Sequence, residues 1–134
     1  MNGRLDVPAV GWTMLRFAVL KSLLATAGFG RTWRWIQLRA QRTPLRHDVD
    51  AARISDVEHA VAMAAALYPG HAACLERSLL LYWYLRRAGV PVAFRMGVQM
   101  YPFLAHAWVE HGERPINDLL EHVRQFRPIE GVAG

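Results

Sequence analysis

One stretch decides the fold: Pro69-Gly70-His71-Ala72-Ala73-Cys74-Leu75-Glu76-Arg77-Ser78, which runs directly into Leu79-Leu80-Leu81-Tyr82-Trp83-Tyr84-Leu85. It contains the single cysteine of the chain. A Pro-Gly turn before this cysteine and an apolar run after it predict that Cys74 lies in the first turn of a buried helix. A helix N-terminus favours negative charge and therefore the thiolate, which is the nucleophilic form of cysteine. The alternative is a packed structural residue, because free cysteine is often buried.

The composition is that of one globular domain. The chain has 134 residues, of which 53% are hydrophobic and 20% are charged, a balance opposite to that of a disordered protein. A single cysteine cannot form an internal disulfide, and the N-terminus shows no secretory signal pattern. We therefore expect a cytoplasmic protein.

The positive charge is concentrated at the N-terminal end. Residues 1–46 carry eight basic side chains and one acidic side chain, whereas residues 47–134 carry eight basic and ten acidic ones. This asymmetry indicates an acidic partner or surface, such as nucleic acid, an anionic membrane or an acidic peptide. No recognised nucleic-acid module accompanies the basic residues, so we expect no nucleic-acid partner. Peripheral contact with the inner membrane face stays open.

Two helices are predicted in this basic segment, one between Trp12 and Gly30 and one over residues 31–42, before Pro44. Their apolar sides consist of Trp12, Leu15, Val19, Leu23 and Leu24 in the first helix and of Trp33, Trp35 and Leu38 in the second. We expect both sides to pack on the core of the protein, with docking to a partner or a membrane as the alternative. Two cations inside the first helix, Arg16 and Lys21, argue against a membrane span.

The rest of the chain predicts helices followed by strands. A loop over residues 43–50 separates a basic helical segment, residues 1–50, from the remainder of the domain, residues 51–134. Ser55-Asp56-Val57-Glu58 fits a capping box and predicts the start of a helix that ends at Pro69-Gly70. The central helix follows over residues 73–88 and stops at Gly89.

Strict alternation of apolar and polar residues predicts strands over residues 90–100 and 105–110. His111-Gly112-Glu113 predicts a tight turn into a returning strand over residues 114–118. A short helix or turn over residues 119–126 and an edge strand over residues 127–129 complete the pattern. Helices followed by a small antiparallel sheet define the α+β class.

A nucleophilic Cys74 requires a base within reach and a group that orients the base. His106 lies on the second predicted strand. In a hairpin that turns at residues 111–113, position 106 pairs with a residue near 117–118, whose Cβ then lies about 4.5–5.5 Å away. Asn117 and Asp118 are adjacent, and the alternation of strand side chains places only one of them on the His106 face. Spacing alone leaves both residues as candidates.

The remaining histidines are expected in loops, in turns or on exposed helix faces; they are His47, His59, His71, His111 and His122. A zinc site needs three or four closely spaced ligands, and neither the single cysteine nor any H-E-x-x-H pattern provides them. No glycine-rich nucleotide-binding motif occurs either. We therefore expect no metal and no cofactor.

Several motifs together resemble one bacterial family. They are Cys74-Leu75-Glu76-Arg77-Ser78-Leu79, Leu85-Arg86-Arg87-Ala88-Gly89-Val90-Pro91, Arg95-Met96-Gly97-Val98, Ala105-His106-Ala107-Trp108-Val109-Glu110 and Asn117-Asp118. In this order and separation, over residues 54–119, the chain is similar to the lasso-peptide leader peptidases of the transglutaminase-like, papain-related superfamily.

The resemblance implies a papain-like core and a Cys-His-Asp triad at Cys74, His106 and Asp118. It also implies removal of the leader from a ribosomally made precursor peptide, before a separate ATP-dependent cyclase closes the lasso. Residues 1–50 are too few for a fused leader-recognition domain, so a separate small recognition protein is expected. The resemblance assigns no second oxyanion-hole donor and no role to Arg77 and Ser78.

Two other functions stay open at this point. One is a non-catalytic adaptor that docks a peptide or a membrane and in which Cys74 is structural. The other is an acyltransferase or transglutaminase, because the same triad can pass an acyl group to an amine instead of water.

Overall fold

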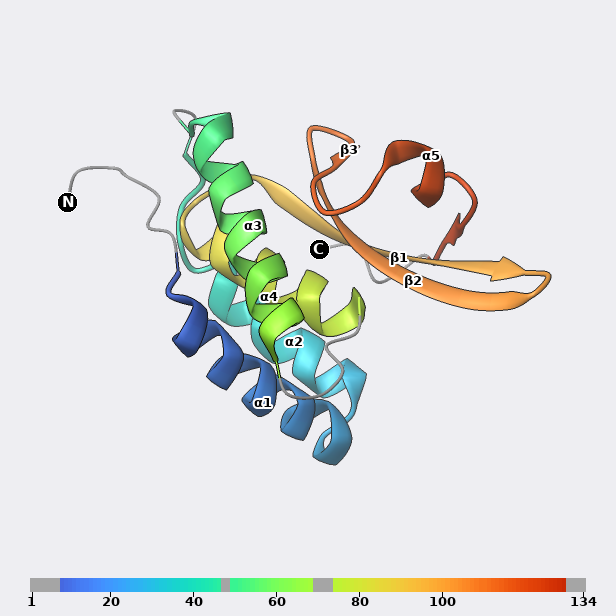
Figure 1. The fold of residues 1–134 in the computed structure, drawn as a ribbon, viewed down its shortest axis with the longest axis horizontal. Helices are drawn as coiled ribbons and strands as arrows, with labels where there is room; N and C mark the ends of the chain where they lie inside the picture. The colour runs from blue at the N-terminus through green and yellow to red at the C-terminus, as the bar shows by residue number, and fades with distance from the viewer. Residues whose placement is uncertain (1–7, 47–48, 69–73, 130–134) are drawn as a thin grey trace.

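A computed structural model describes residues 8–46, 49–68 and 74–129 (Figure 1). Its elements in chain order are α1 (Val10–Thr26), α2 (Phe29–Ala40), α3 (Ala51–Leu67), α4 (Cys74–Arg87), β1 (Val92–Met100), β2 (Phe103–His111), β3 (Arg114–Pro115), α5 (Leu120–Val123) and β4 (Arg127–Pro128). The long helices α1 to α4 precede a four-stranded antiparallel sheet. This order confirms the predicted α+β class.

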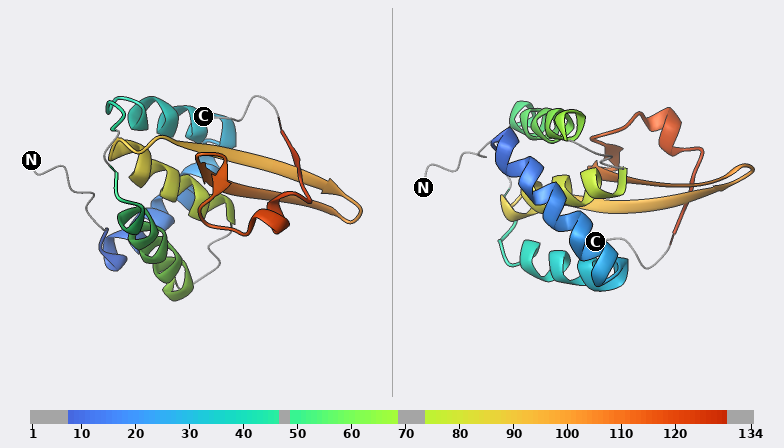
Figure 2. Two further views of the ribbon diagram at one scale, coloured as in Figure 1. Left: turned by 90° about the horizontal axis from the view of Figure 1, so that it is seen from above. Right: turned by 60° about the horizontal axis from the view of Figure 1, so that its bottom comes forward.

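Helix α4 is the centre of the molecule, as its apolar sequence predicted. It packs against α1, α2 and α3 and also against β1 and β2 (Figure 2). The helix ends in a Schellman motif, in which the N–H of Val90 donates to the carbonyl of Leu85 and Gly89 takes a left-handed φ of 87°. The predicted stop at Gly89 is therefore confirmed. Cys74 is the first residue of the helix.

Helices α1 and α2 bury only part of the predicted sides: Trp33 is buried and Leu24 packs against the core, as predicted, whereas most other members of those sides are exposed. The buried residues are Thr13, Phe17 and Leu20 in α1 and Thr32, Trp33, Ile36 and Ala40 in α2. Exposed instead are Trp12, Leu15, Val19, Trp35 and Leu38. Apolar residues lie on more than one side of each helix, so their spacing identified only part of the side that meets the core. Among the residues that the structure describes, no helix is long and apolar enough to cross a membrane.

Helix α3 begins at Ala51, before the predicted capping box at Ser55–Glu58. Its N-cap is Asp50, whose Oδ1 accepts a hydrogen bond from the N–H of Ala52 at 3.0 Å. Aspartate caps a helix as well as serine does, because both side chains accept a bond from an otherwise unpaired N–H. The prediction of a capping box at Ser55 is therefore wrong, and Ser55 lies inside the helix.

The sheet has the strand order β3-β2-β1-β4, and its two faces carry different cores. Pairs such as Phe94 with Val109 face the helices and join the main core. The alternate pairs, such as Gly97 with His106, face the other way, where α5 lies (Figure 2). A second, smaller core on that side consists of Trp108, Val123 and Phe126. The predicted edge strand is confirmed as β4, which pairs with β1.

The predicted turn is present at Gly112 and Glu113, but His111 belongs to strand β2 and the strand that follows the turn is short. His111 pairs with Arg114, and Gly112 and Glu113 both have positive φ, as in a tight hairpin turn. Strand β3 ends at Pro115, so the predicted pairing of position 106 with residue 117 or 118 is wrong. Beyond Pro115, the side chains of Asn117 and Ser78, rather than a longer β3, bond to the edge of β2.

Candidate active site

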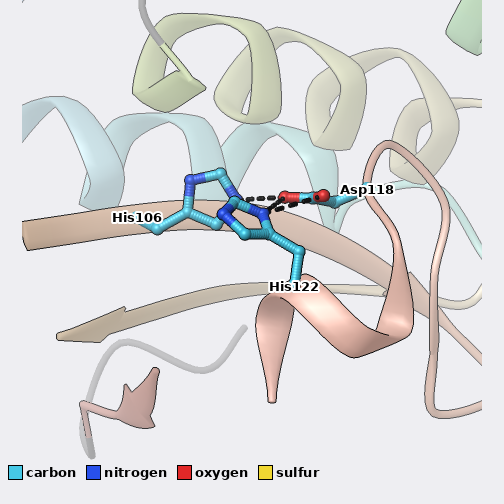
Figure 3. A group of neighbouring side chains, drawn as sticks. All are labelled: His106, Asp118 and His122. Atoms are coloured by element: carbon cyan, nitrogen blue, oxygen red, sulfur yellow. Dashed lines mark hydrogen bonds and ion pairs between the residues drawn. The ribbon is translucent and has the colours of Figure 1, made fainter. Parts of the chain in front are cut away.

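A hydrogen bond joins His106 and Asp118 at the centre of the site (Figure 3). His106 extends from β2, and its Nε2 atom bonds Oδ2 of Asp118. Asp118 lies in the bend between β3 and α5, where its Oδ1 accepts the N–H of Leu119 at 2.7 Å. Both side chains are largely buried, with 15% of His106 and 16% of Asp118 exposed. The bend after β3, rather than strand pairing, therefore brings Asp118 to His106.

A second imidazole, that of His122, shares the same carboxylate. Its Nδ1 lies 3.0 Å from Oδ1 and 2.9 Å from Oδ2 of Asp118 (Figure 3). His122 is half exposed on α5, and its ring centroid lies 4.8 Å from that of His106. Sequence reasoning treated this histidine as a surface residue and missed its contact. The four-residue spacing from Asp118 to His122 was the available signal, because residues so spaced meet on a helix.

These contacts set the charge of Asp118. Burial raises the pKa of this carboxyl, but hydrogen bonds from His122, His106 and the N–H of Leu119 outweigh that effect. The pKa of Asp118 therefore lies below its ordinary value, and the group is a carboxylate at neutral pH. A carboxylate only accepts hydrogen bonds, so Nε2 of His106 carries a proton. In the neutral ring, Nδ1 then has the free lone pair.

Aromatic side chains surround His106 on this face of the sheet. The ring centroid of Trp108 lies 5.8 Å from that of His106, and the centroid of Phe126 lies 5.1 Å away. Gly97 is directly opposite His106 on β1, and a Cβ at this position would lie 2.7 Å from the Cβ of Phe126. The absence of a side chain at Gly97 therefore makes room for Phe126 beside the imidazole.

Cys74 lies on α4, which packs against β2. It is a free, partly exposed thiol in the first turn of the helix. One turn later, the Ser78 hydroxyl donates to the carbonyl of Ala107 at 3.0 Å, and Ala107 is the neighbour of His106 on β2. Side chains four residues apart lie on the same side of a helix, so Cys74 lies on the side of α4 from which Ser78 contacts β2.

The thiol and the imidazole are not hydrogen-bonded. Within the described part of the chain, Cys74 makes no hydrogen bond to His106, and such contacts are often looser without substrate. In Figure 3 the Nδ1 atom of His106 points away from Asp118 and to the side on which α4 begins. The predicted Pro-Gly turn and His71 lie outside the described residues.

Asn117, the other candidate for orienting His106, has different partners. Its Oδ1 accepts the N–H of Val109 at 3.0 Å, and its Nδ2 donates to Oγ of Ser78 at 2.9 Å. The two adjacent side chains diverge because the chain bends here instead of continuing as a strand. Asp118 contacts His106, and Asn117 contacts α4 and the edge of β2.

The same cluster offers donors for a metal ion. One nitrogen from each of His106 and His122 and one oxygen of Asp118 lie within 4.8 Å of one another, and no other such group occurs among the described residues. Imidazole and carboxylate donors suit zinc or copper. Sequence spacing pointed at most to the pair of Asp118 and His122, because His106 comes from a different element, strand β2.

Comparison with known proteins identifies the family. Residues 16–131 match the model of the transglutaminase-like superfamily, and the chain belongs to that superfamily. The superfamily includes cysteine peptidases and acyltransferases, which confirms the broader part of the resemblance found in the sequence. Searches of curated proteins and of solved structures gave no match.

Proposed function

We propose that the chain is a cysteine peptidase that removes the leader from a ribosomally made precursor peptide during lasso-peptide biosynthesis. The observation that carries the proposal is the hydrogen bond between Asp118 and His106, beside the helix that begins at Cys74. Membership of a superfamily that includes cysteine peptidases supports the chemistry. The sequence motifs around these residues support the substrate class.

Cys74 is the nucleophile and His106 is the base. Nδ1 of His106 removes the thiol proton, and the sulfur attacks the carbonyl carbon of the scissile peptide bond. The imidazolium returns this proton to the leaving nitrogen as the C–N bond breaks, so the core peptide departs as an amine and the leader stays on Cys74 as a thioester. Water, deprotonated by the same nitrogen, then hydrolyses the thioester and regenerates the thiol.

Asp118 orients the base. It accepts the Nε2 proton of His106, which keeps the lone pair on Nδ1, and its charge stabilises the imidazolium that forms during each step. The backbone N–H of Cys74 is the proposed oxyanion donor, because the first N–H groups of a helix have no intrahelical acceptor.

Mass spectrometry of the precursor after incubation with the chain and its recognition protein tests this proposal. Cys74→Ala abolishes cleavage, because the thioester cannot form, and His106→Ala lowers the rate by at least about 100-fold. His59→Ala serves as the control, since His59 is an exposed histidine on α3. Cleavage persists in EDTA, since the proposed steps use no metal ion. Full activity of Cys74→Ala would end the proposal.

The same spectra separate the alternatives. Hydrolysis yields a leader with a free carboxyl group, whereas an acyltransferase yields a leader joined to the added amine. An adaptor yields neither product, and its Cys74 reacts with iodoacetamide no faster than free cysteine does.

The surface between α1 and α2 is the proposed binding site for the recognition protein that carries the precursor. We define this α1–α2 surface by five exposed apolar side chains, those of Trp12, Leu15, Val19, Trp35 and Leu38. Two of them, Val19 and Trp35, line an apolar groove in which Trp35 stacks on Trp83 of α4, with 5.4 Å between ring centroids. Residues 8–46 carry seven cations and no acidic side chain. An apolar partner with acidic residues complements this surface.

An anionic membrane is the other candidate occupant of the α1–α2 surface, and vesicle binding distinguishes it from a protein partner. The proposal includes no nucleic acid. The product of leader removal, a core peptide with a free N-terminal amine, is the substrate that the separate cyclase requires.

A further inference from the structure

We infer that Ser78 and Asn117 are positioning residues that assemble the active site, an inference that rests on the proposed function. The two side chains form one chain of hydrogen bonds across the edge of β2. The Val109 N–H donates to Asn117 Oδ1, the Asn117 amide donates to Ser78 Oγ, and the Ser78 hydroxyl donates to the Ala107 carbonyl. We call these two side chains the β2 clamp.

The β2 clamp takes the place of a longer strand β3. The last backbone bond on this edge runs from the N–H of Ile116 to the carbonyl of Val109 at 2.8 Å. Beyond it, the N–H of Val109 and the carbonyl of Ala107 have side-chain partners instead of strand partners. Backbone groups on a buried strand edge need hydrogen-bond partners. Because the clamp provides them, no further strand is needed at this edge of β2, and α4 contacts it through Ser78.

Each segment held by the β2 clamp carries one member of the proposed triad. Ser78 lies one helical turn after Cys74, Asn117 immediately precedes Asp118, and Ala107 immediately follows His106. A shift of any one segment relative to the others therefore changes the distance between sulfur, imidazole and carboxylate. Misplacement by about 1 Å costs an enzyme as much as about 100-fold in rate.

The serine of the clamp is buried, which makes its hydrogen-bond geometry strict. Ser78 is fully buried, and removal of its hydroxyl leaves both the Asn117 amide and the Ala107 carbonyl without that partner. Unpaired polar groups in the interior are costly, so the structure around them shifts to find new partners. Loss of a buried hydroxyl far from the active site serves as a matched control. Thr13, also fully buried, bonds the Tyr84 hydroxyl near the other end of α4.

The experiment compares Ser78→Ala and Asn117→Ala with Thr13→Val in three measurements: kcat and KM of leader cleavage, the rate of Cys74 alkylation by iodoacetamide across pH, and unfolding in urea. Loss of positioning lowers kcat about 10- to 100-fold with KM nearly unchanged. It also removes the rapid alkylation that an imidazole beside the thiol produces below about pH 7. Thr13→Val keeps both kcat and alkylation, whatever stability it loses.

Two further variants sharpen the result. Ser78→Thr retains a hydroxyl and restores most of kcat, and the double variant Ser78→Ala/Asn117→Ala is no slower than the slower single variant, because the two residues act as one unit. If Ser78→Ala does not fold, Asn117→Ala carries the test, since Asn117 is only partly buried.

The β2 clamp has no positioning role if folded Ser78→Ala or Asn117→Ala matches Thr13→Val in kcat and alkylation. A different result overturns the proposed function itself: wild-type Cys74 that reacts at every pH like free cysteine is not an activated nucleophile, and the clamp then positions nothing.

Discussion

At the scale of single residues, Asp118 binds two imidazoles and one backbone N–H with its two oxygens. Sequence spacing alone could not choose between Asp118 and Asn117. The outcome depends on where β3 stops, because after Pro115 the chain bends and strand alternation no longer determines which of the two side chains faces His106. His122 was overlooked for a related reason, since helix α5 is too short to show a periodic pattern.

The lowered pKa of Asp118 predicts how stability depends on pH. In the unfolded chain this carboxyl binds its proton at a higher pH than in the folded protein, so folding is favoured while the group is ionised. The contribution is complete above about pH 5 and is lost as the pH falls below 3.8 and through the folded pKa. Urea unfolding of wild type and Asp118→Asn therefore shows a stability difference that shrinks towards acid pH. A difference that does not change with pH contradicts this account.

His122 is predicted to lower the pKa of Asp118. Its hydrogen bond is the largest of the favourable effects on the ionised carboxyl, so His122→Ala raises the pKa of Asp118 in a carbon NMR titration. Leader cleavage falls by less than about tenfold, because Asp118 keeps its bond to His106. His59→Ala leaves the pKa unchanged. An unchanged or lower pKa in His122→Ala would show that the contact does not form in solution.

At the scale of elements, the helices and long strands could be predicted because their apolar patterns are long. The ends of these elements and the sides that they bury were harder to predict. The start of α3 was missed because Asp50 and Ser55 are both good caps, and the structure uses Asp50, whose carboxylate accepts the N–H of Ala52. The buried sides of α1 and α2 were predicted only in part, because the core accepts Phe17 and Ile36, while equally apolar residues such as Trp12 and Trp35 stay outside.

Gly97 links β1 to the second core, and its replacement is predicted to disturb α5 and β4. In Gly97→Ala the new Cβ meets the Cβ of Phe126 at 2.7 Å and the carbonyl of Arg127 at 3.0 Å, so backbone must move. Overpacking of this kind costs about 1–3 kcal/mol. Urea unfolding measures the loss, and leader cleavage falls with it because Phe126 supports His106. Gly11→Ala, with open space around it, is the control. Equal stability of the two variants would contradict the predicted packing.

At the scale of the whole molecule, the basic N-terminal helices share one core with the helix of Cys74. Phe17, Leu20, Trp33 and Ile36 from α1 and α2 lie in the same cluster as residues of α4 and the sheet. The superfamily match also begins inside α1, at residue 16. The α1–α2 surface is therefore the outer side of helices whose inner side holds the fold together.

Charge reversal on the α1–α2 surface is predicted to weaken binding of the recognition protein. The double variant Arg34→Glu/Arg39→Glu reverses two exposed cations of α2 and lowers affinity about 10- to 100-fold at low salt, and less at high salt, because ions screen surface charges. Calorimetry at two salt concentrations measures the effect. Arg114→Glu, an exposed cation on β3, has little effect. If both variants bind as wild type does, the partner lies elsewhere.

The two cores on opposite faces of the sheet give the molecule two levels of stability. Cys74 belongs to the helical layer, whereas His106 lies against Trp108 and Phe126 of the small cluster, and Asp118 is bonded to His106. A cluster of this size opens at a lower free energy than the whole domain does. Amide hydrogens of α5 therefore exchange faster than those of α4, and leader cleavage disappears at a urea concentration at which the helical circular dichroism is still intact. Coincident transitions would show a single cooperative unit. We therefore predict that inactivation begins as a local opening around α5, which reverses without refolding of the helices.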